Sequence, residues 1–216
     1  MSLEELTSSA IELLKSLIAT PSFSEEEDQT AELIDAWLKK YGVITRREGN
    51  SVIAVNKHED PSKPYFLLNS HHDTVRPNKA YTRDPFTPEV IDGKLYGLGS
   101  NDAGGPLVSL MATFVHFYNR SDLPYNLVMV ASAEEETAGK NSLRGILPLL
   151  PEFELAIVGE PTLLDLAIAE KGLLVYDAIV KGTPSHAAHP NYDNPIDRKS
   201  TRLNSSHVRT SRMPSS

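Results

Sequence analysis

The chain has 216 residues, of which 40% are hydrophobic and 23% charged, and this length and composition indicate a globular protein with one full core and at most a small second unit. Its formal net charge of −8 argues against a nucleic-acid partner, which needs clustered Lys and Arg, and the absence of cysteine leaves His, Asp and Glu to hold any metal. No apolar run reaches the roughly 20 residues of a membrane span, and the acidic N-terminus does not resemble a signal peptide, so we expect a cytoplasmic protein.

Two amphipathic helices are predicted at the start of the chain. Apolar residues recur at helical spacing over residues 3–18, and the first helix should end before Pro21 because the residue that precedes a proline disfavours helical backbone. Ser24 is the expected N-cap of the second helix, since the three glutamates that follow it suit the positive end of the helix dipole. An apolar stripe that includes Trp37 continues this helix as far as Gly42.

The rest of the chain alternates short apolar runs with helical segments. The expected elements are strands at 51–57 and 65–70, a Pro- and Gly-rich loop at 76–99, a helix at 106–118, a strand at 125–133, a short helical stretch at 143–150 and a strand at 153–160. Continuous apolar strands between helices are typical of an α/β fold with a mostly parallel sheet flanked by helices. From residue 173 an alternating pattern replaces the continuous runs. We therefore predict one domain at 1–172 and the start of a second at 173–196.

The last twenty residues differ in composition from the rest of the chain. The stretch "DRKSTRLNSSHVRTSRMPSS" has no apolar period and carries five basic residues against one acidic residue. Composition alone is typical of a disordered basic tail. We prefer a second interpretation, because "DRKSTRLNSSH" resembles the translation, in one frame, of a widely used sequencing-adapter oligonucleotide. Residues 197–216 would then be a non-native disordered tail, the natural protein would be cut near Ile196, and the net charge of the natural part would be −12 instead of −8.

Acidic and imidazole side chains gather where the predicted strands end. In chain order they are His71, His72, Asp73, Asp102, Glu134, Glu135, Glu136 and Glu160. Sites in open α/β sheets form outside the carboxyl ends of the strands, so these residues should meet at one rim. Each has an ordinary explanation when taken alone, as a solvated histidine or an acidic helix start. Together they indicate a divalent cation, because clustered carboxylates destabilise a fold unless a cation neutralises them.

The residue types narrow the choice of metal ion. His with Asp and Glu, and without Cys, suits zinc or cobalt better than calcium, which prefers oxygen ligands alone. A phosphate loop is the alternative for "GLGSNDAGG". Asp102 stands where the third glycine of G-x-G-x-x-G would be, however, and an anionic residue would repel a pyrophosphate.

The chain resembles the M20 family of dinuclear zinc amidohydrolases and peptidases over about residues 3–196. Two short segments carry the first part of this likeness. "SHHDTV" resembles the family's [GS]-H-x-D-[TV]-V, which implies that His71 is a metal ligand, that His72 occupies a variable position and that Asp73 orients the His71 ring. "GLGSNDAGG" resembles G-x-G-x-x-D-x-[KG]-G, which implies that Asp102 bridges two metal ions. Gly104 stands in place of the commoner lysine of that motif.

Two further segments resemble the same family. "SAEEETAG" is similar to its D-E-E stretch, which places Glu134 first, makes Glu135 the general base and makes Glu136 a ligand. "VGEPT" implies that Glu160 is a ligand. The resemblance implies that His71, Asp102 and Glu160 hold one Zn²⁺ ion and that Asp102 and Glu136 hold its neighbour. The family has one more histidine ligand at the second ion, which we expect beyond the cut. The resemblance implies two Zn²⁺ ions, or Co²⁺ in their place.

The segment "KGTPSHAAHPNYDNPI" resembles the opening of the family's α+β lid or dimerisation domain. Its K-G-x-x-x-H motif supplies a histidine that polarises the substrate carbonyl, often across a homodimer. His186 matches this motif better than His189 does. A structural histidine at the end of a strand is the alternative interpretation of His186.

The resemblance implies metal-dependent hydrolysis of the amide bond of an N-acylated amino acid. Overall likeness favours the acetylornithine-deacetylase branch, which would place the protein in arginine biosynthesis. A di- or tripeptidase or a succinyl-diaminopimelate desuccinylase of the same family stays open. The alternative from another class is an inactive metal-binding fragment, because we expect a truncated chain to lack part of its site.

Overall fold

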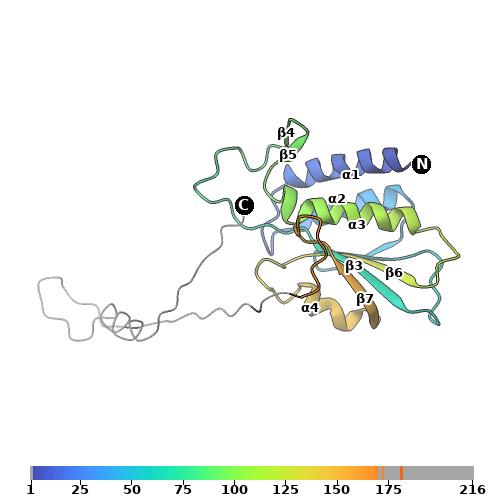
Figure 1. Cartoon of the computed structure of the whole chain (residues 1–216). Helices are drawn as coiled ribbons and strands as arrows, with labels where there is room; N and C mark the ends of the chain where they lie inside the picture. The colour runs from blue at the N-terminus through green and yellow to red at the C-terminus, as the bar shows by residue number, and fades with distance from the viewer. Residues whose placement is uncertain (1, 170–171, 173–180, 182–216) are drawn as a thin grey trace, which may run out of the picture. The chain divides into compact units, whose positions relative to one another are not determined.

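The computed structural model describes residues 2–169, 172 and 181 (Figure 1). The chain divides into two units, Met1–Leu166 and Ala167–Ser216, and the helices and strands described below lie in the first. The predicted lid segment with His186 and His189, and the predicted tail at 197–216, lie outside the described residues. Among the residues that are described, no helix is long and apolar enough to span a membrane.

The first unit is a five-stranded sheet with helices around it. Its elements are α1 (Leu3–Ile18), α2 (Asp28–Lys40), β1 (Thr45–Glu48), β2 (Ser51–Val55), β3 (Tyr65–His71), β4 (Glu89–Ile91), β5 (Lys94–Tyr96), the helical turn η1 (Ser100–Gly104), α3 (Gly105–Phe117), β6 (Asn126–Ser132), α4 (Leu143–Ile146), the 3₁₀ turn η2 (Leu147–Leu149) and β7 (Phe153–Val158). The sheet order is β1-β2-β6-β3-β7, and β4 and β5 form a separate hairpin. Strands β6, β3 and β7 run parallel, whereas β2 is antiparallel to both β1 and β6.

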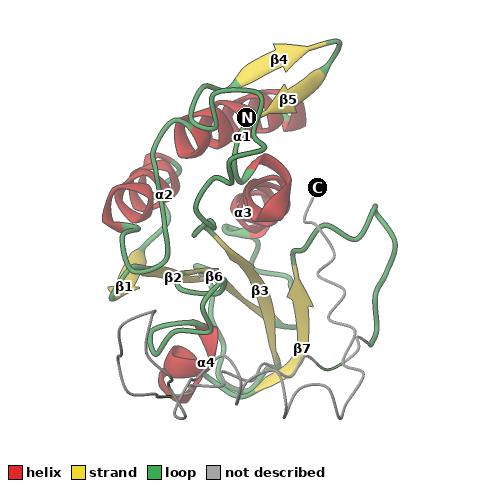
Figure 2. Ribbon diagram, turned by 90° about the vertical axis from the view of Figure 1, so that its left-hand side faces the viewer, coloured by secondary structure: helices red, strands yellow, loops and turns green. Residues whose placement is uncertain are grey.

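Helices lie on both faces of the sheet, as the continuous apolar strands predicted. Figure 2 shows α1, α2 and α3 on one face and α4 on the other. Strand β6 is buried along its whole length, and its residues alternate between two cores. Leu127 and Met129 pack with the three long helices, whereas Val128 and Val130 pack with Ile146 of α4. The predicted α/β class is confirmed.

The direction in which the chain leaves the sheet changes between the carboxyl ends of β3 and β6. These two strands are parallel neighbours. The connection that follows β3 contains α3 on one face of the sheet, and the connection that follows β6 contains α4 on the opposite face (Figure 2). The chain therefore diverges from the two strand ends in opposite directions, which is the arrangement that opens a ligand site in α/β sheets.

The structure corrects the expected start of the second helix. Helix α2 begins at Asp28 and its N-cap is Glu27, which makes no side-chain capping hydrogen bond. Ser24 is not the cap, because its hydroxyl donates to the carboxylate of Asp73 instead. The loop expected at 76–99 also contains a short hairpin, β4–β5, and the sequence patterns missed β1.

Candidate metal centre

His71 is the last residue of β3, and its ring is held in one orientation. The imidazole is 1% exposed, and its Nδ1 lies 2.9 Å from the backbone oxygen of Asp73 and 3.4 Å from Oδ1 of the same residue. Because a carbonyl oxygen only accepts, Nδ1 carries the hydrogen in this contact. This leaves Nε2 directed at Asp102, whose Oδ1 is 3.2 Å away. With a metal ion in place of the Nε2 proton, a ring held in this orientation would offer the Nε2 lone pair to that ion.

The carboxylate of Asp73 organises the loop that follows β6. It is fully buried and accepts hydrogen bonds from the backbone N–H of Glu135, at 3.0 Å, and of Glu136, at 3.1 Å. Burial raises the pKa of Asp73, but the hydrogen bonds from His71, Ser24 and the Glu135 backbone outweigh this effect and hold the pKa below its ordinary value. Asp73 thus contacts the His71 ring, as predicted, and also anchors two consecutive N–H groups, which was not predicted.

Glu134 turns the chain sharply at the end of β6. Its φ of 56° lies in the left-handed region, which non-glycine residues rarely adopt. Its side chain is buried and accepts a hydrogen bond from the backbone N–H of Asn141 at 3.0 Å, while its carbonyl accepts one from Gly139 at 2.9 Å. Glu134 therefore closes the turn, and it is the next two glutamates that reach the rim.

Gly139 is the position where this turn has no room for a larger residue. A Cβ at Gly139 would lie 2.1 Å from Oε2 and 2.8 Å from Cβ of Glu134. We expect Gly139→Ala to lower the free energy of unfolding by about 1–3 kcal/mol, the usual effect of overpacking. Urea denaturation followed by circular dichroism would measure it. Gly172→Ala is the matched control, since a Cβ there meets nothing within 4 Å, and an equal denaturation midpoint for both variants would contradict the packing argument.

Asp102 reaches the rim because the backbone leaves the helical conformation at that residue. Within η1 its φ and ψ are −114° and 98°, between a left-handed Gly99 and the start of α3. Gly99 has a φ of 73°, and a Cβ there would lie 2.7 Å from Cγ2 of Thr74. The glycines of "GLGSNDAGG" thus allow a tight turn against the end of β3.

The predicted ligands converge in space. Ligand atoms of His71, Asp102 and Glu136 all lie within 4.8 Å of one another. The Nε2 atom of His71 is also 3.9 Å from Oε2 of Glu135 and 3.9 Å from Oε1 of Glu160. Four chain segments that are distant in sequence therefore deliver one imidazole and four carboxylates to the same rim.

The carboxylates of this cluster are crowded. Burial, together with the charge of Asp102, raises the pKa of Glu136 to about 7. Burial also raises the pKa of Glu160 to about 7, against the opposing charge of His71. Burial lowers the pKa of His71, but its hydrogen bonds to Asp102 and Asp73 prevail and raise it to about 11. Neighbouring carboxylates add to the effect of burial on both glutamates, and the imidazole and carboxylate donors fit a divalent cation of the zinc or cobalt type.

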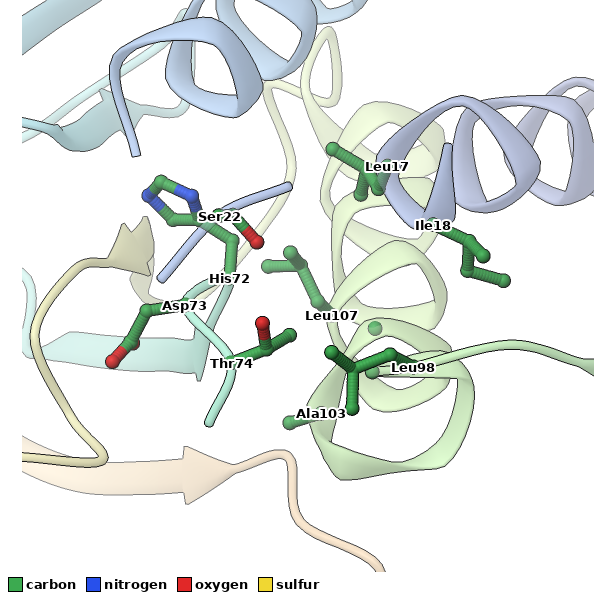
Figure 3. A pocket seen from close by; sticks show the side chains of 11 residues that line it. Leu17, Ile18, Ser22, His72, Asp73, Thr74, Leu98, Ala103 and Leu107 are labelled. Carbon is green, nitrogen blue, oxygen red and sulfur yellow. The ribbon is translucent and has the colours of Figure 1, made fainter. Parts of the chain in front are cut away.

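Part of the cluster is open to solvent. The side chains of Asp102, Glu135 and Glu160 are 46%, 54% and 36% exposed, whereas His71 and Asp73 are buried. Behind them is a cavity of about 20 Å³, bounded by α1, α3 and the residues after β3 (Figure 3). That volume suffices for about one water molecule and for no substrate. A substrate must therefore approach from the exposed carboxylate side.

His72 faces away from the cluster. Its Nε2 lies 3.0 Å from the backbone oxygen of Asn50, and its Nδ1 lies 2.9 Å from the hydroxyl of Thr30. Burial lowers its pKa to about 4, so the ring is neutral and donates from Nε2. His72 is a structural histidine that joins α2 and the β1–β2 turn to the end of β3.

Comparison with known proteins identifies the family. The model of "Peptidase family M20/M25/M40" matches residues 67–209, a match that extends into the predicted tail. Acetylornithine deacetylase from Yersinia pseudotuberculosis is 34% identical over 199 residues, which cover 83% of this chain and 50% of that protein. Acetylornithine deacetylase from Shigella sonnei is 33% identical over 198 residues, with 83% and 50% covered. The chain thus spans about half the length of the curated relatives it matches.

Solved structures share the fold. Human carnosine dipeptidase 1 superposes with a TM-score of 0.56 at 20% identity, over 73% of this chain and 40% of that one. A dinuclear metal-binding peptidase of the M20 family from Bacillus subtilis gives a TM-score of 0.55 at 17% identity, and the match covers 72% of this chain and 43% of that one. These likenesses show a shared fold.

Proposed function

The chain belongs to peptidase family M20/M25/M40, and on that premise we propose that its full-length form is a metal-dependent hydrolase that cleaves the amide bond of an N-acylated amino acid. The observation that carries the proposal is the convergence of His71, Asp102 and Glu136 within 4.8 Å, with Glu135 and Glu160 beside them. The similarity to two acetylornithine deacetylases supports acetylornithine as the substrate.

The proposed ligands are those that the family resemblance implies, and all four lie in the cluster. His71, Asp102, Glu136 and Glu160 would hold two Zn²⁺ ions, or Co²⁺ in their place, with Asp102 shared between them. A bound divalent ion of this kind lowers the pKa of water towards neutrality and polarises a carbonyl oxygen. Asp73 keeps the His71 ring oriented through Nδ1, at 2.9 Å from its carbonyl oxygen, so that Nε2 faces the ion.

Glu135 is the proposed general base. Its backbone N–H is fixed by Asp73 while its carboxylate remains 54% exposed at the open side of the cluster. There it accepts a proton from the attacking water as the C–O bond forms, and it passes this proton to the amine nitrogen as the C–N bond breaks. Distance does not separate Glu135 from the proposed ligand Glu160, since an oxygen of each lies 3.9 Å from Nε2 of His71, and it is the family resemblance that assigns Glu135 as the base.

The remaining assignments stay predictions from the sequence. His186 would polarise the substrate carbonyl, and it lies outside the described residues. Three more predictions rest on the sequence alone: a homodimer formed through the lid domain, a cytoplasmic location and a place in arginine biosynthesis.

A substrate panel tests the proposed function. The full-length protein, with its sequence read from the genomic DNA, would be assayed with acetylornithine, acetylcitrulline, succinyl-ornithine, succinyl-diaminopimelate and a dipeptide. We expect acetylornithine to give the highest kcat/KM. Dialysis against a chelator should abolish turnover, and Zn²⁺ or Co²⁺ should restore it, because the carboxylate cluster needs the cation to act. Turnover that survives metal removal would refute the proposal, and a preference for the dipeptide would move the enzyme to the peptidase branch.

A further inference from the structure

The loop between α1 and α2 runs beside the residues that follow β3. The backbone N–H of Thr74 donates to the carbonyl of Ser22 at 2.8 Å, and Phe23 forms a parallel β-bridge with Thr74. Figure 3 shows Ser22 next to His72 and Thr74 at the wall of the small cavity. Segment 22–27 is therefore attached to the metal-centre side of the sheet.

Ser24 of this segment fixes the carboxylate that anchors the loop after β6. Its hydroxyl donates to Oδ2 of Asp73 at 2.7 Å. The same Oδ2 accepts the backbone N–H of Glu136, and Oδ1 accepts that of Glu135. A rotation of the Asp73 carboxylate would break both backbone contacts, and the Ser24 hydroxyl opposes that rotation.

Glu27 contacts the same loop one residue earlier. Its side chain is fully buried, and one oxygen, Oε1, accepts the backbone N–H groups of Glu25, at 2.7 Å, and of Glu134, at 3.2 Å. The other oxygen, Oε2, accepts from the amide of Asn50 at 2.9 Å. Burying a carboxylate is unfavourable, and Glu27 makes no capping hydrogen bond to its own helix. Its longest-range contact, with a residue 107 positions away, is the one to Glu134.

The contact between Glu27 and Glu134 affects the direction in which the Glu135 side chain points. Glu134 is in the left-handed conformation, and the next two residues present their N–H groups to Asp73. Without an acceptor for its buried N–H, the left-handed conformation of Glu134 would be unfavourable, and the backbone would lower its free energy by rotating toward the ordinary extended conformation. That rotation would swing the following peptide and redirect the side chain of Glu135.

We infer that Ser24 and Glu27 are positioning residues for the base: through Asp73 and Glu134 they hold three consecutive N–H groups and so aim the Glu135 carboxylate. This inference rests on the proposed function, since it takes Glu135 as the base. Neither residue touches the cluster itself. The three glutamates at positions 25–27 therefore differ in role, because only Glu27 is buried.

Kinetics of the full-length enzyme test the inference. We expect Glu27→Ala to lower kcat by about 100-fold, the scale of a misplacement near 1 Å, with KM and metal content little changed. Glu27→Gln should recover part of this loss, because its amide oxygen still accepts from Glu134 while its NH₂ faces that of Asn50. Glu26→Ala is the matched control and should keep the wild-type kcat, since Glu26 is exposed and pairs with Arg76. Ser24→Ala should lower kcat, and Ser24→Thr should restore it. Folded Glu27→Ala and Ser24→Ala enzymes with wild-type kcat would overturn the inference.

Amide hydrogen exchange separates this inference from the proposed function. In the 216-residue chain, the N–H groups of Glu135 and Glu136 should exchange faster in Ser24→Ala and Glu27→Ala, whereas those of Val128 and Val130 in β6 should not change. This readout needs no substrate, so it holds even if no amide on the panel is cleaved. Unchanged exchange at Glu135 and Glu136, or faster exchange throughout β6, would overturn the inference. If Glu27→Ala fails to fold, Ser24→Ala alone decides.

Discussion

Glu135→Gln in the full-length enzyme should lower kcat by roughly 10²–10⁴-fold, the usual contribution of a general base, while the metal content stays at the wild-type level. Glutamine has the shape of glutamate but cannot take up a proton from water. The backbone of residue 135 would remain anchored, because Asp73 accepts its N–H irrespective of the side chain. The proposed ligand set of His71, Asp102, Glu136 and Glu160 would be unchanged in this variant, so we expect the metal to be retained.

The measurement pairs steady-state kinetics with elemental analysis of the same preparation. Glu154→Gln, on exposed surface of β7, is the control and should behave as wild type in both. Loss of metal from Glu135→Gln would place Glu135 among the ligands instead. Wild-type kcat with full metal content would exclude Glu135 as the base and leave another group of the rim in that role.

The meeting of the carboxylates could be predicted from the sequence because it follows from strand direction. The apolar runs of β3 and β6 lead into His71 at the end of β3 and, after Ala133, into the three glutamates that follow β6. In parallel neighbours the carboxyl ends lie at the same edge, so His71 and Glu136 had to approach each other. The turn that aims Glu135 could not be predicted, since it depends on a left-handed Glu134 and on acceptors 62 and 107 positions away.

The local errors have specific causes. The hairpin β4–β5 had an available signal, because Asp92 and Gly93 stand between two short apolar runs and both adopt positive φ. β1 had none, since "TRRE" lacks apolar residues and is a strand only through its pairing with β2. Ser24 carried a misleading signal: a serine before acidic residues is typical of an N-cap, but its hydroxyl donates to Asp73, a partner 49 positions away.

β7 differs from the other parallel strands in its environment. Its sequence "FELAIV" is as continuously apolar as that of β6, which is typical of a strand buried on both faces. Leu155, Ile157 and Val158 are nevertheless about half exposed, because β7 is the edge strand of the sheet among the described residues. The pattern in the sequence therefore indicates more burial than these residues receive from the described part of the chain.

Asp102→Ala should weaken zinc binding by the 216-residue chain by at least about 100-fold, and it should remove both ions from the full-length enzyme together. Asp102 is the nearest carboxylate to the Nε2 atom of His71, at 3.2 Å, and it also belongs to the group that contains Glu136. The proposed bridging role requires that both sites lose their ions together when Asp102 is removed.

Isothermal titration with Zn²⁺ would measure this effect, and we expect one tight and one weak site in the unmodified chain. Asp122→Ala is the matched control, because Asp122 is an exposed aspartate paired with Arg120 and should leave both sites unchanged. Asp102→Asn adds a variant of the same shape without the charge, and it should also lose zinc if charge, and not packing, holds the ions. Retention of two tightly bound ions by Asp102→Ala would contradict the bridging role, since His71 with Glu160 and Glu136 alone would then suffice to bind them.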